Sequence, residues 1–142
     1  MPDITSPTCV LRLTVELKDL AQIRRFVQES AEAFGVAARD VPNVLLAVDE
    51  AVTNVILHGY AGHGGPIEIV VSRLPGALVI RLHDEARPFD PTGVPAPDLT
   101  IPLVERAPGG LGIHLIRQIM DELSYRRRPG GGNELTMIKQ IA

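Results

Sequence analysis

The sequence predicts an α+β fold, a two-layer α/β sandwich in which helices cover one face of a mixed sheet. Three stretches have the apolar spacing of helices, and five stretches have the pattern of strands. Their order along the chain is β-α-α-β-β-loop-α-β-β. Strands that are adjacent in sequence are expected to pair as hairpins, which favours this architecture over a doubly wound parallel sheet.

The first part of the chain is expected to hold one strand and two helices. Residues 8–16 alternate between apolar and polar side chains, the pattern of a half-buried strand. An amphipathic helix follows from Asp19, and Gly35 is placed to cap its end. Asp40 can cap a second helix, whose apolar stripe is so broad that we expect it to be largely buried up to its end near His58.

Two strands and a long loop are expected next. The glycine-rich stretch 59–66 predicts a loop, and a tight turn at 74–76 joins strands over 67–74 and 77–84. Residues 85–110 hold six prolines and no convincing periodicity. A stretch of this length without regular structure is uncommon in a compact domain and is often functional.

The end of the chain predicts one helix and a hairpin. The helix starts near Gly110 and carries on one face the apolar residues Ile113, Ile116, Met120 and Leu123. Strands over 124–128 and 134–141 then flank a glycine-rich turn at 130–133.

Length and composition exclude several classes of protein. The 142 residues suit one domain, expected over 8–142 after a tail of residues 1–7. Lys and Arg number 14 against 17 Asp and Glu, and the net charge of −3 argues against direct nucleic-acid binding. Cys9 is the single cysteine, so no disulfide within the chain is possible. The sequence has neither a signal-peptide pattern nor an apolar run of about 18 residues, which predicts a cytoplasmic protein without a membrane span.

The first candidate site lies on the helix that is expected to be buried. Glu50, Asn54 and His58 are spaced four residues apart and therefore share one face. A carboxylate and a carboxamide on such a helix need partners, because an unpaired buried polar group costs about 1–3 kcal/mol. Oxygen ligands of this kind suit Mg²⁺, which proteins often hold with one or two groups plus substrate phosphates. The alternative is a solvated helix rim without a ligand.

Two further candidates lie at Asp84 and at the start of the third helix. Asp84 ends a predicted strand, so its carboxylate can accept a hydrogen bond from an exocyclic amine such as that of adenine; alternatively, it only begins the loop. The glycines of 108–113 leave backbone N–H groups at a helix start free to face an anion. This segment lacks the Gly-Lys-Ser/Thr of a Walker A loop, and Leu115 stands at the third glycine position of a dinucleotide fingerprint.

The remaining polar residues carry less functional information. The four histidines have no metal-ligand spacing, and no Ser-His-Asp grouping is visible. Arg126, Arg127 and Arg128 alternate across a predicted strand. That alternation favours protection of a sheet edge by charge over a nucleic-acid site.

In combination, these motifs resemble those of a known superfamily. The helix with Glu-x-x-x-Asn, the Asp at a strand end and the Gly-x-Gly helix start resemble the N, G1 and G2 boxes of the histidine-kinase-like (GHKL) ATPases. More narrowly, segments 47–54, 109–116, 120–123 and 132–137 resemble the small bacterial anti-sigma-factor serine/threonine kinases. The resemblance covers nearly the whole chain and implies the Bergerat α/β sandwich, with ATP held between the helical layer and a mobile lid.

The resemblance implies a role for each matching residue. Asn54 would coordinate Mg²⁺ that bridges the phosphates, Glu50 would act as general base toward the attacking hydroxyl, and Asp84 would bind the adenine amino group. Residues 90–108 match the lid, where Arg106 would steady phosphate charge. The other positions implied to contact the nucleotide are Ala86, Gly109, Gly110, Leu111, Gly112, Ile113 and Thr136.

The function implied is that of an ATP-dependent protein-serine/threonine kinase that regulates a sigma factor. Its substrate would be a serine or threonine on an anti-sigma-factor antagonist protein, and its second partner would be the sigma factor that it sequesters. Such kinases are commonly homodimers. Phosphoryl transfer needs mainly positioning, metal and charge stabilisation, which these residue types can supply.

One departure from the family pattern leaves an alternative open. The G1 box usually has glycine two residues after the aspartate, where this chain has Ala86. Alanine lacks glycine's access to positive φ and adds a methyl group close to the expected adenine. This favours a regulatory module that binds a partner without transferring phosphate, whereas the intact Glu50 and Asn54 favour the kinase. A structural domain without a ligand is the third alternative.

Overall fold

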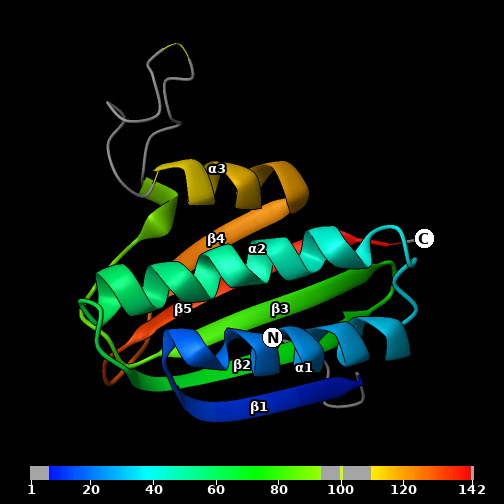
Figure 1. Ribbon diagram of the computed structural model, residues 1–142. Helices are drawn as coiled ribbons and strands as arrows, with labels where there is room; N and C mark the ends of the chain where they lie inside the picture. The colour runs from blue at the N-terminus through cyan, green and yellow to red at the C-terminus, as the bar shows by residue number, and fades with distance from the viewer. Residues whose placement is uncertain (1–6, 94–99, 101–109, 142) are drawn as a thin grey trace.

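The computed structural model describes residues 7–93, 100 and 110–141. Within them, five strands form one sheet and three α-helices cover one of its faces, which confirms the two-layer α+β architecture (Figure 1). The strands are β1 (Thr8–Val15), β2 (Gly65–Leu74), β3 (Ala77–Asp84), β4 (Glu122–Arg127) and β5 (Asn133–Gln140). The helices are α1 (Leu20–Ala33), α2 (Val41–Asn54) and α3 (Gly110–Ile119), with short helical turns η1 (Leu17–Asp19), η2 (Val55–Gly59) and η3 (Pro91–Gly93). None of the described helices is long and apolar enough to cross a membrane.

The sheet is antiparallel at every ladder between described strands, so the expected mixed sheet is wrong in this respect. The strand order is β1-β2-β3-β5-β4. The crossover through α3 makes β4 parallel to β3, but β5 turns back and inserts between them. The parallel strands are therefore not neighbours, and each hydrogen-bonded pair is antiparallel.

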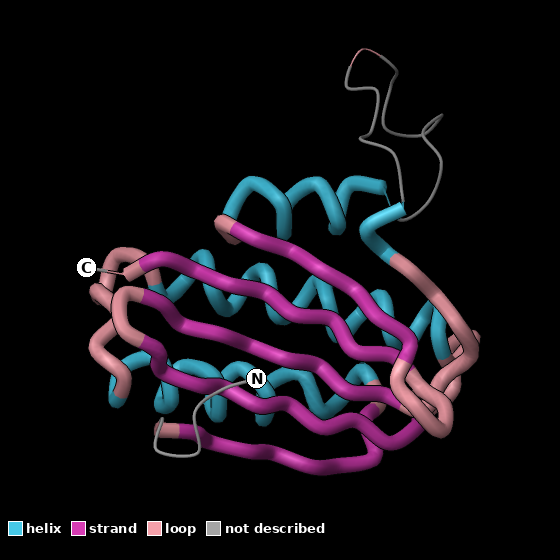
Figure 2. The backbone as a smooth tube through the Cα atoms, turned by 180° about the vertical axis from the view of Figure 1, so that it is seen from behind, coloured by secondary structure: helices cyan, strands magenta, loops and turns pink. Residues whose placement is uncertain are grey.

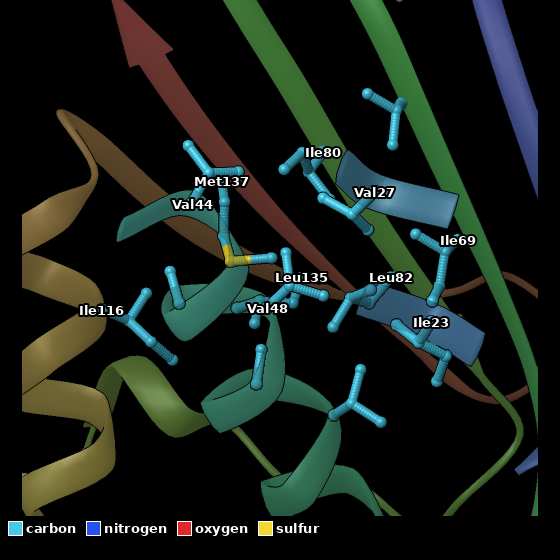
Figure 3. Close-up of a cluster of buried hydrophobic side chains, with 14 of the residues drawn as sticks. Ile23, Val27, Val44, Val48, Ile69, Ile80, Leu82, Ile116, Leu135 and Met137 are labelled. Carbon is cyan, nitrogen blue, oxygen red and sulfur yellow. The ribbon is translucent and has the colours of Figure 1, made fainter. Parts of the chain in front are cut away.

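The core lies between the helices and the sheet, and α2 is its centre. Half of the 14 residues of α2 are buried, which confirms the expectation from its broad apolar stripe. Figure 3 shows the side chains of α1, α2 and α3 meeting those of β2, β3 and β5. The labelled residues are Ile23, Val27, Val44, Val48, Ile69, Ile80, Leu82, Ile116, Leu135 and Met137. Burial on this scale holds α2 firmly in place, so polar groups along it are rigidly positioned.

The structure confirms one of the predicted helix ends and differs from the prediction at two others. Gly35 adopts a φ of +83°, and the next N–H, that of Val36, donates to Ala31 O at 3.0 Å, as in a glycine-terminated helix. Asp40 occupies the N-cap position of α2, but its side chain makes no capping hydrogen bond. The third helix ends at Ile119, and Leu123 lies in β4 instead of continuing the helical face.

Figure 2 shows the sheet face that no described helix covers. A row of charged side chains crosses this face. It consists of Arg12, Glu68, His83, Glu134 and Arg126, one from each strand. Successive nitrogen–oxygen distances along the row are 2.5, 2.9, 2.6 and 2.7 Å. His83 can donate to both carboxylates only when each ring nitrogen carries a proton. Since β4 is an edge strand, the pairing of Arg126 agrees with the predicted edge position of the arginine run.

This row predicts a loss of stability in acid. The hydrogen bond from His83 lowers the pKa of Glu68, and that from Arg126 lowers the pKa of Glu134, relative to the ordinary value of 4.5. Carboxylates with lowered folded-state pKa stabilise the fold above their unfolded pKa, and that contribution disappears as the pH falls through the folded-state pKa. We expect Glu68→Gln and Glu134→Gln each to cost about 1 kcal/mol or less at pH 7 and to flatten the fall in melting temperature from pH 5 to pH 3.

The control for this prediction is Glu29→Gln, on the exposed surface of α1. Melting temperatures of the three variants and the parent, measured by circular dichroism at each pH, give the comparison. A fall of the same steepness in all four proteins would contradict the assignment.

Candidate functional site

The carboxyl end of α2 carries the first pair of predicted site residues. Asn54 is the last residue of α2 and is 8% exposed, and its Nδ2 atom has no hydrogen-bond partner among the described residues. Glu50 lies one turn earlier and makes no ion pair there, whereas the neighbouring Asp49 is bound to Arg24 of α1 at 2.7 Å. Contacts with the described residues therefore leave Glu50 and Asn54 available for a ligand. Asp49 uses Oδ2 to bind Arg24, and its Oδ1 is buried without a partner among the same residues.

His58 does not continue the helical face of Glu50 and Asn54, because the winding of the helix changes after Asn54. After Asn54 the chain continues as the π-helical turn η2, and such turns are frequent at functional sites. The imidazole of His58 stacks on Phe89 with ring centroids 5.3 Å apart, and its carbonyl oxygen accepts two hydrogen bonds from Arg87. His58 thus anchors the segment after β3 and does not extend the polar face of Glu50 and Asn54.

The start of α3 lies directly against this pair. A Cβ atom added at Gly112 would lie 2.6 Å from Glu50 Oε2 and 3.8 Å from Asn54 Nδ2. Gly112 therefore leaves room for the Glu50 carboxylate in this position, which a side chain at residue 112 would displace. Gly110 and Leu111 open the same helix, whereas Arg106 and Gly109 lie outside the described residues. The fold therefore brings together two motifs that are about 60 residues apart in the sequence.

Asp84 lies at the end of β3 and is 5% exposed. Its Oδ1 atom accepts hydrogen bonds from the Ala86 N–H at 2.9 Å and from Asn133 Nδ2 at 2.8 Å. Oδ2 accepts no hydrogen bond from a described residue. One oxygen of the carboxylate is thus fixed by the fold, and the other is free to accept.

A small cavity joins these elements. Its volume is about 20 Å³, and it is lined by Ala51, Asn54, Val55, Gly59, Asp84, Phe89, Pro91, Ile113, Tyr125, Asn133 and Leu135. This volume holds about one water molecule. A purine can therefore enter only if the lining moves apart. Phe89 directly precedes the predicted lid, and Pro91 lies within it.

The chain matches the family described as the histidine kinase-like ATPase domain over residues 13–139. It belongs to this family. The match spans the helix with Glu50 and Asn54, the strand end at Asp84 and the helix start at Gly112, so the site lies within the matched domain.

Several relatives of this histidine kinase-like ATPase domain are similar over nearly their whole length. It is 29% identical over 140 residues to the serine/threonine-protein kinase BtrW of Bordetella bronchiseptica, covering 98% of each chain. It is 30% identical over 146 residues to an anti-sigma F factor of Clostridium acetobutylicum, covering 94% of this chain and 97% of that one. It is 27% identical over 124 residues to the serine-protein kinase RsbW of Bacillus cereus, covering 84% of this chain and 78% of that one.

A solved structure supports the fold. The crystal structure of the RsbU and RsbW domains of Rv1364c from Mycobacterium tuberculosis matches with a TM-score of 0.62 and 18% identity. The match covers 95% of this ATPase domain and 33% of that longer chain. The likeness therefore concerns the arrangement of helices and strands.

The donor set of the candidate site fits Mg²⁺ beside phosphates. The described residues contain no group of three or more His, Cys, Asp or Glu that could hold a metal. Mg²⁺ at a phosphate site instead takes one or two protein oxygens and completes its shell with phosphate and water. The carboxamide of Asn54 offers one such oxygen, Oδ1, on a largely buried residue beside Gly112. Its amide nitrogen, which has no partner among the described residues, is a donor and would face a phosphate oxygen instead of the metal.

Ala86 fits the ATPase fold without backbone strain. Among the described residues other than glycine, only Ala61 has a positive φ, so Ala86 does not need the freedom that glycine provides. Ala86 is 4% exposed, and its methyl group lies 3.0 Å from the position that a Cβ at Gly59 would take. Gly59 thus provides the space for the methyl group, and the conformational objection to Ala86 is removed.

This packing predicts coupling between positions 59 and 86. We expect Gly59→Ala to lower the free energy of unfolding by about 1–2 kcal/mol, because the two methyl groups would be too close. In the Ala86→Gly background the same change should be neutral or stabilising, since alanine is the better helix former. Urea unfolding of the two single variants and the double variant measures the coupling. Equal costs in both backgrounds would show that the methyl groups do not meet.

Thr136 lies on the wrong face of the sheet to line the cavity. Side chains alternate along β5, and Leu135, not Thr136, lines the cavity. Thr136 pairs with Arg81 on the face that the described helices leave open. Its predicted nucleotide contact therefore disagrees with its position, whereas Ile113 does line the cavity.

Sequence patterns missed two residues that line the cavity and a tyrosine, Tyr60, that contacts the residue after Asp84. Asn133 and Tyr125 line the cavity from β5 and β4. Tyr60 donates its hydroxyl to Pro66 O at 2.6 Å and accepts from the Glu85 N–H at 2.9 Å. Burial, with a contribution from the charge of Asp84, raises the pKa of Tyr60. The one local sequence signal for Asn133 is its place directly after three glycines, at the first position of β5.

Proposed function

We propose that this chain is an ATP-dependent protein-serine/threonine kinase that phosphorylates an anti-sigma-factor antagonist and sequesters a sigma factor. The observation that carries the proposal is that Gly112 lies against Glu50 and Asn54, and that Asn54 and Asp84 line one cavity. The family match and the names of the relatives support it. We further propose that the protein is cytoplasmic and forms a homodimer. Light scattering of the purified protein tests the dimer.

The proposed chemistry assigns a task to each group. Asp84 accepts a hydrogen bond from the adenine amine, and the N–H groups at the start of α3 face the phosphates. Glu50 takes the proton from the serine hydroxyl as its oxygen bonds to the γ-phosphorus and the bond to the β-γ bridging oxygen breaks, which leaves ADP. Asn54 would hold Mg²⁺, which supplies charge neutralisation at the phosphates when bound.

Phosphoryl transfer from labelled ATP to a purified antagonist protein tests this proposal. The target serine of the antagonist changed to alanine serves as the control. We expect the parent to transfer phosphate, and Glu50→Gln to bind Mg-ATP with little change in affinity but to transfer at least about 100-fold more slowly. A Glu50→Gln variant as active as the parent would contradict the assigned base.

A binding module without transferase activity is the second candidate. The small volume of the cavity, about 20 Å³, favours it, because this conformation does not admit a purine. The same experiment separates the two. A parent protein that binds Mg-ATP and the antagonist but transfers no phosphate supports the module and contradicts the kinase.

A further inference from the structure

Asn133 connects more of the nucleotide site than any predicted residue. It is the first residue of β5, is 5% exposed and pairs in register with Asp84 of β3. Its Nδ2 atom donates to Asp84 Oδ1 at 2.8 Å and to the carbonyl oxygen of Arg87 at 3.0 Å. Its Oδ1 atom accepts from the Tyr125 hydroxyl at 2.5 Å and from Arg127 Nη1 at 3.4 Å.

These partners fix the orientation of the carboxamide. The Asp84 carboxylate and the Arg87 carbonyl can only accept, so they require the amide nitrogen. The Arg127 guanidinium and the Phe89 N–H, which is 3.4 Å from Asn133 Oδ1, can only donate, so they require the amide oxygen. A flipped amide would lose bonds at both ends, and a buried group that loses its partners is strongly disfavoured.

The fixed amide determines what Asp84 offers to a ligand. Oδ1 is satisfied by Asn133 and by the Ala86 N–H, so Oδ2 is the free acceptor. A base with an exocyclic amine can donate to Oδ2. A base with an oxo group at that position would place its oxygen against Asp84 Oδ2, and both atoms are acceptors. The Asn133 amide N–H groups are held by Asp84 Oδ1 and the Arg87 carbonyl, so they cannot turn toward the oxo group.

We propose that Asn133 is a positioning residue that occupies Asp84 Oδ1, leaves Oδ2 as the acceptor for the purine, and thereby makes the site select an exocyclic amine over an oxo group on the purine. The inference rests on the proposed nucleotide site and adds the residue that sets its base preference. A site built around a buried hydrogen bond rejects an analogue that cannot form it, because the protein group is then left unpaired.

The ratio of the dissociation constants for Mg-ITP and Mg-ATP tests the proposal, because inosine carries an oxo group in place of the adenine amine. We expect the parent to prefer ATP by at least about tenfold. In Asn133→Leu, which is similar in size, ATP should bind about tenfold more weakly while ITP changes less than about twofold. General damage to the fold would weaken both nucleotides together and leave the ratio unchanged.

Tyr125→Phe provides a second variant that keeps the carboxamide. It removes the closest donor to Asn133 Oδ1, and we expect the preference for ATP to fall about threefold; this variant decides the matter if Asn133→Leu does not fold. Asp84→Asn, which can donate as well as accept, should abolish the preference outright.

A preference unchanged in Asn133→Leu and Tyr125→Phe overturns this inference and leaves the nucleotide site in place. A parent that binds neither nucleotide overturns the proposed function, and this inference with it. The two failures are therefore distinguishable in one set of titrations.

Discussion

Gly132→Ala is expected to be the most destabilising single substitution at the site. Gly132 has a φ of +96°, and a Cβ added there would lie against the Asp84 carbonyl oxygen, well inside the 3.0 Å that real Cβ atoms keep. The strained φ and the steric overlap together should lower the free energy of unfolding by about 3 kcal/mol. For a domain of this size the melting temperature should fall by roughly 10 °C, measurable by calorimetry.

Gly131→Ala is the matched control for this prediction. Gly131 has a similar positive φ of +111°, but a Cβ there would meet nothing within 4 Å. This variant should carry only the conformational cost, about 1 kcal/mol. The difference between the two variants measures the close approach of β5 to the end of β3. Equal melting temperatures would show that this approach is not tight.

Asn54→Ala is expected to have the largest effect on nucleotide binding. Mg-ATP at about 100 times its dissociation constant should stabilise the parent by roughly 2.7 kcal/mol, and the variant should lose most of that stabilisation. The free protein should lose no more than about 1 kcal/mol, because no described residue is hydrogen-bonded to the Asn54 amide nitrogen and would lose its partner. Thermal unfolding with and without Mg-ATP measures both quantities.

Thr53→Ala provides the control for Asn54→Ala. Thr53 is the preceding residue of α2 and does not line the cavity. We expect it to keep the full shift with Mg-ATP. An Asn54→Ala protein with the shift of the parent would contradict the assigned role, and a much less stable free protein would mean that Asn54 is a structural residue.

Much of the fold follows from local patterns in the sequence. The five strands, the three helices and the glycine at the end of α1 lie close to where periodicity predicts them. Such patterns are visible because burial on one side of a helix or strand imposes a short repeat on the chain. The helix with Glu50 and Asn54, the strand end at Asp84 and the glycine helix start are local for the same reason.

The differences arise where distant segments meet. The extent of α3 was overestimated because Leu123 continues its apolar spacing, yet β5 recruits that residue into β4. The parallel pair implied by a mixed sheet does not form, since β5 inserts between β3 and β4. The resemblance places Thr136 in the site, whereas the register of β5 turns Leu135 toward the cavity. A shift of one residue exchanges the two faces of a strand, and a single sequence does not determine that shift.

The order and type of the elements, and the residue types available for nucleotide chemistry, can be recognised in the amino-acid sequence. Which of these residues meet depends on how the chain packs. Gly112 touches Glu50, Gly59 makes room for Ala86, and Asn133 holds Asp84 across 49 residues of chain. These contacts depend on strand order, register and helix packing, which are properties of the whole folded chain, so no local pattern of residues encodes them.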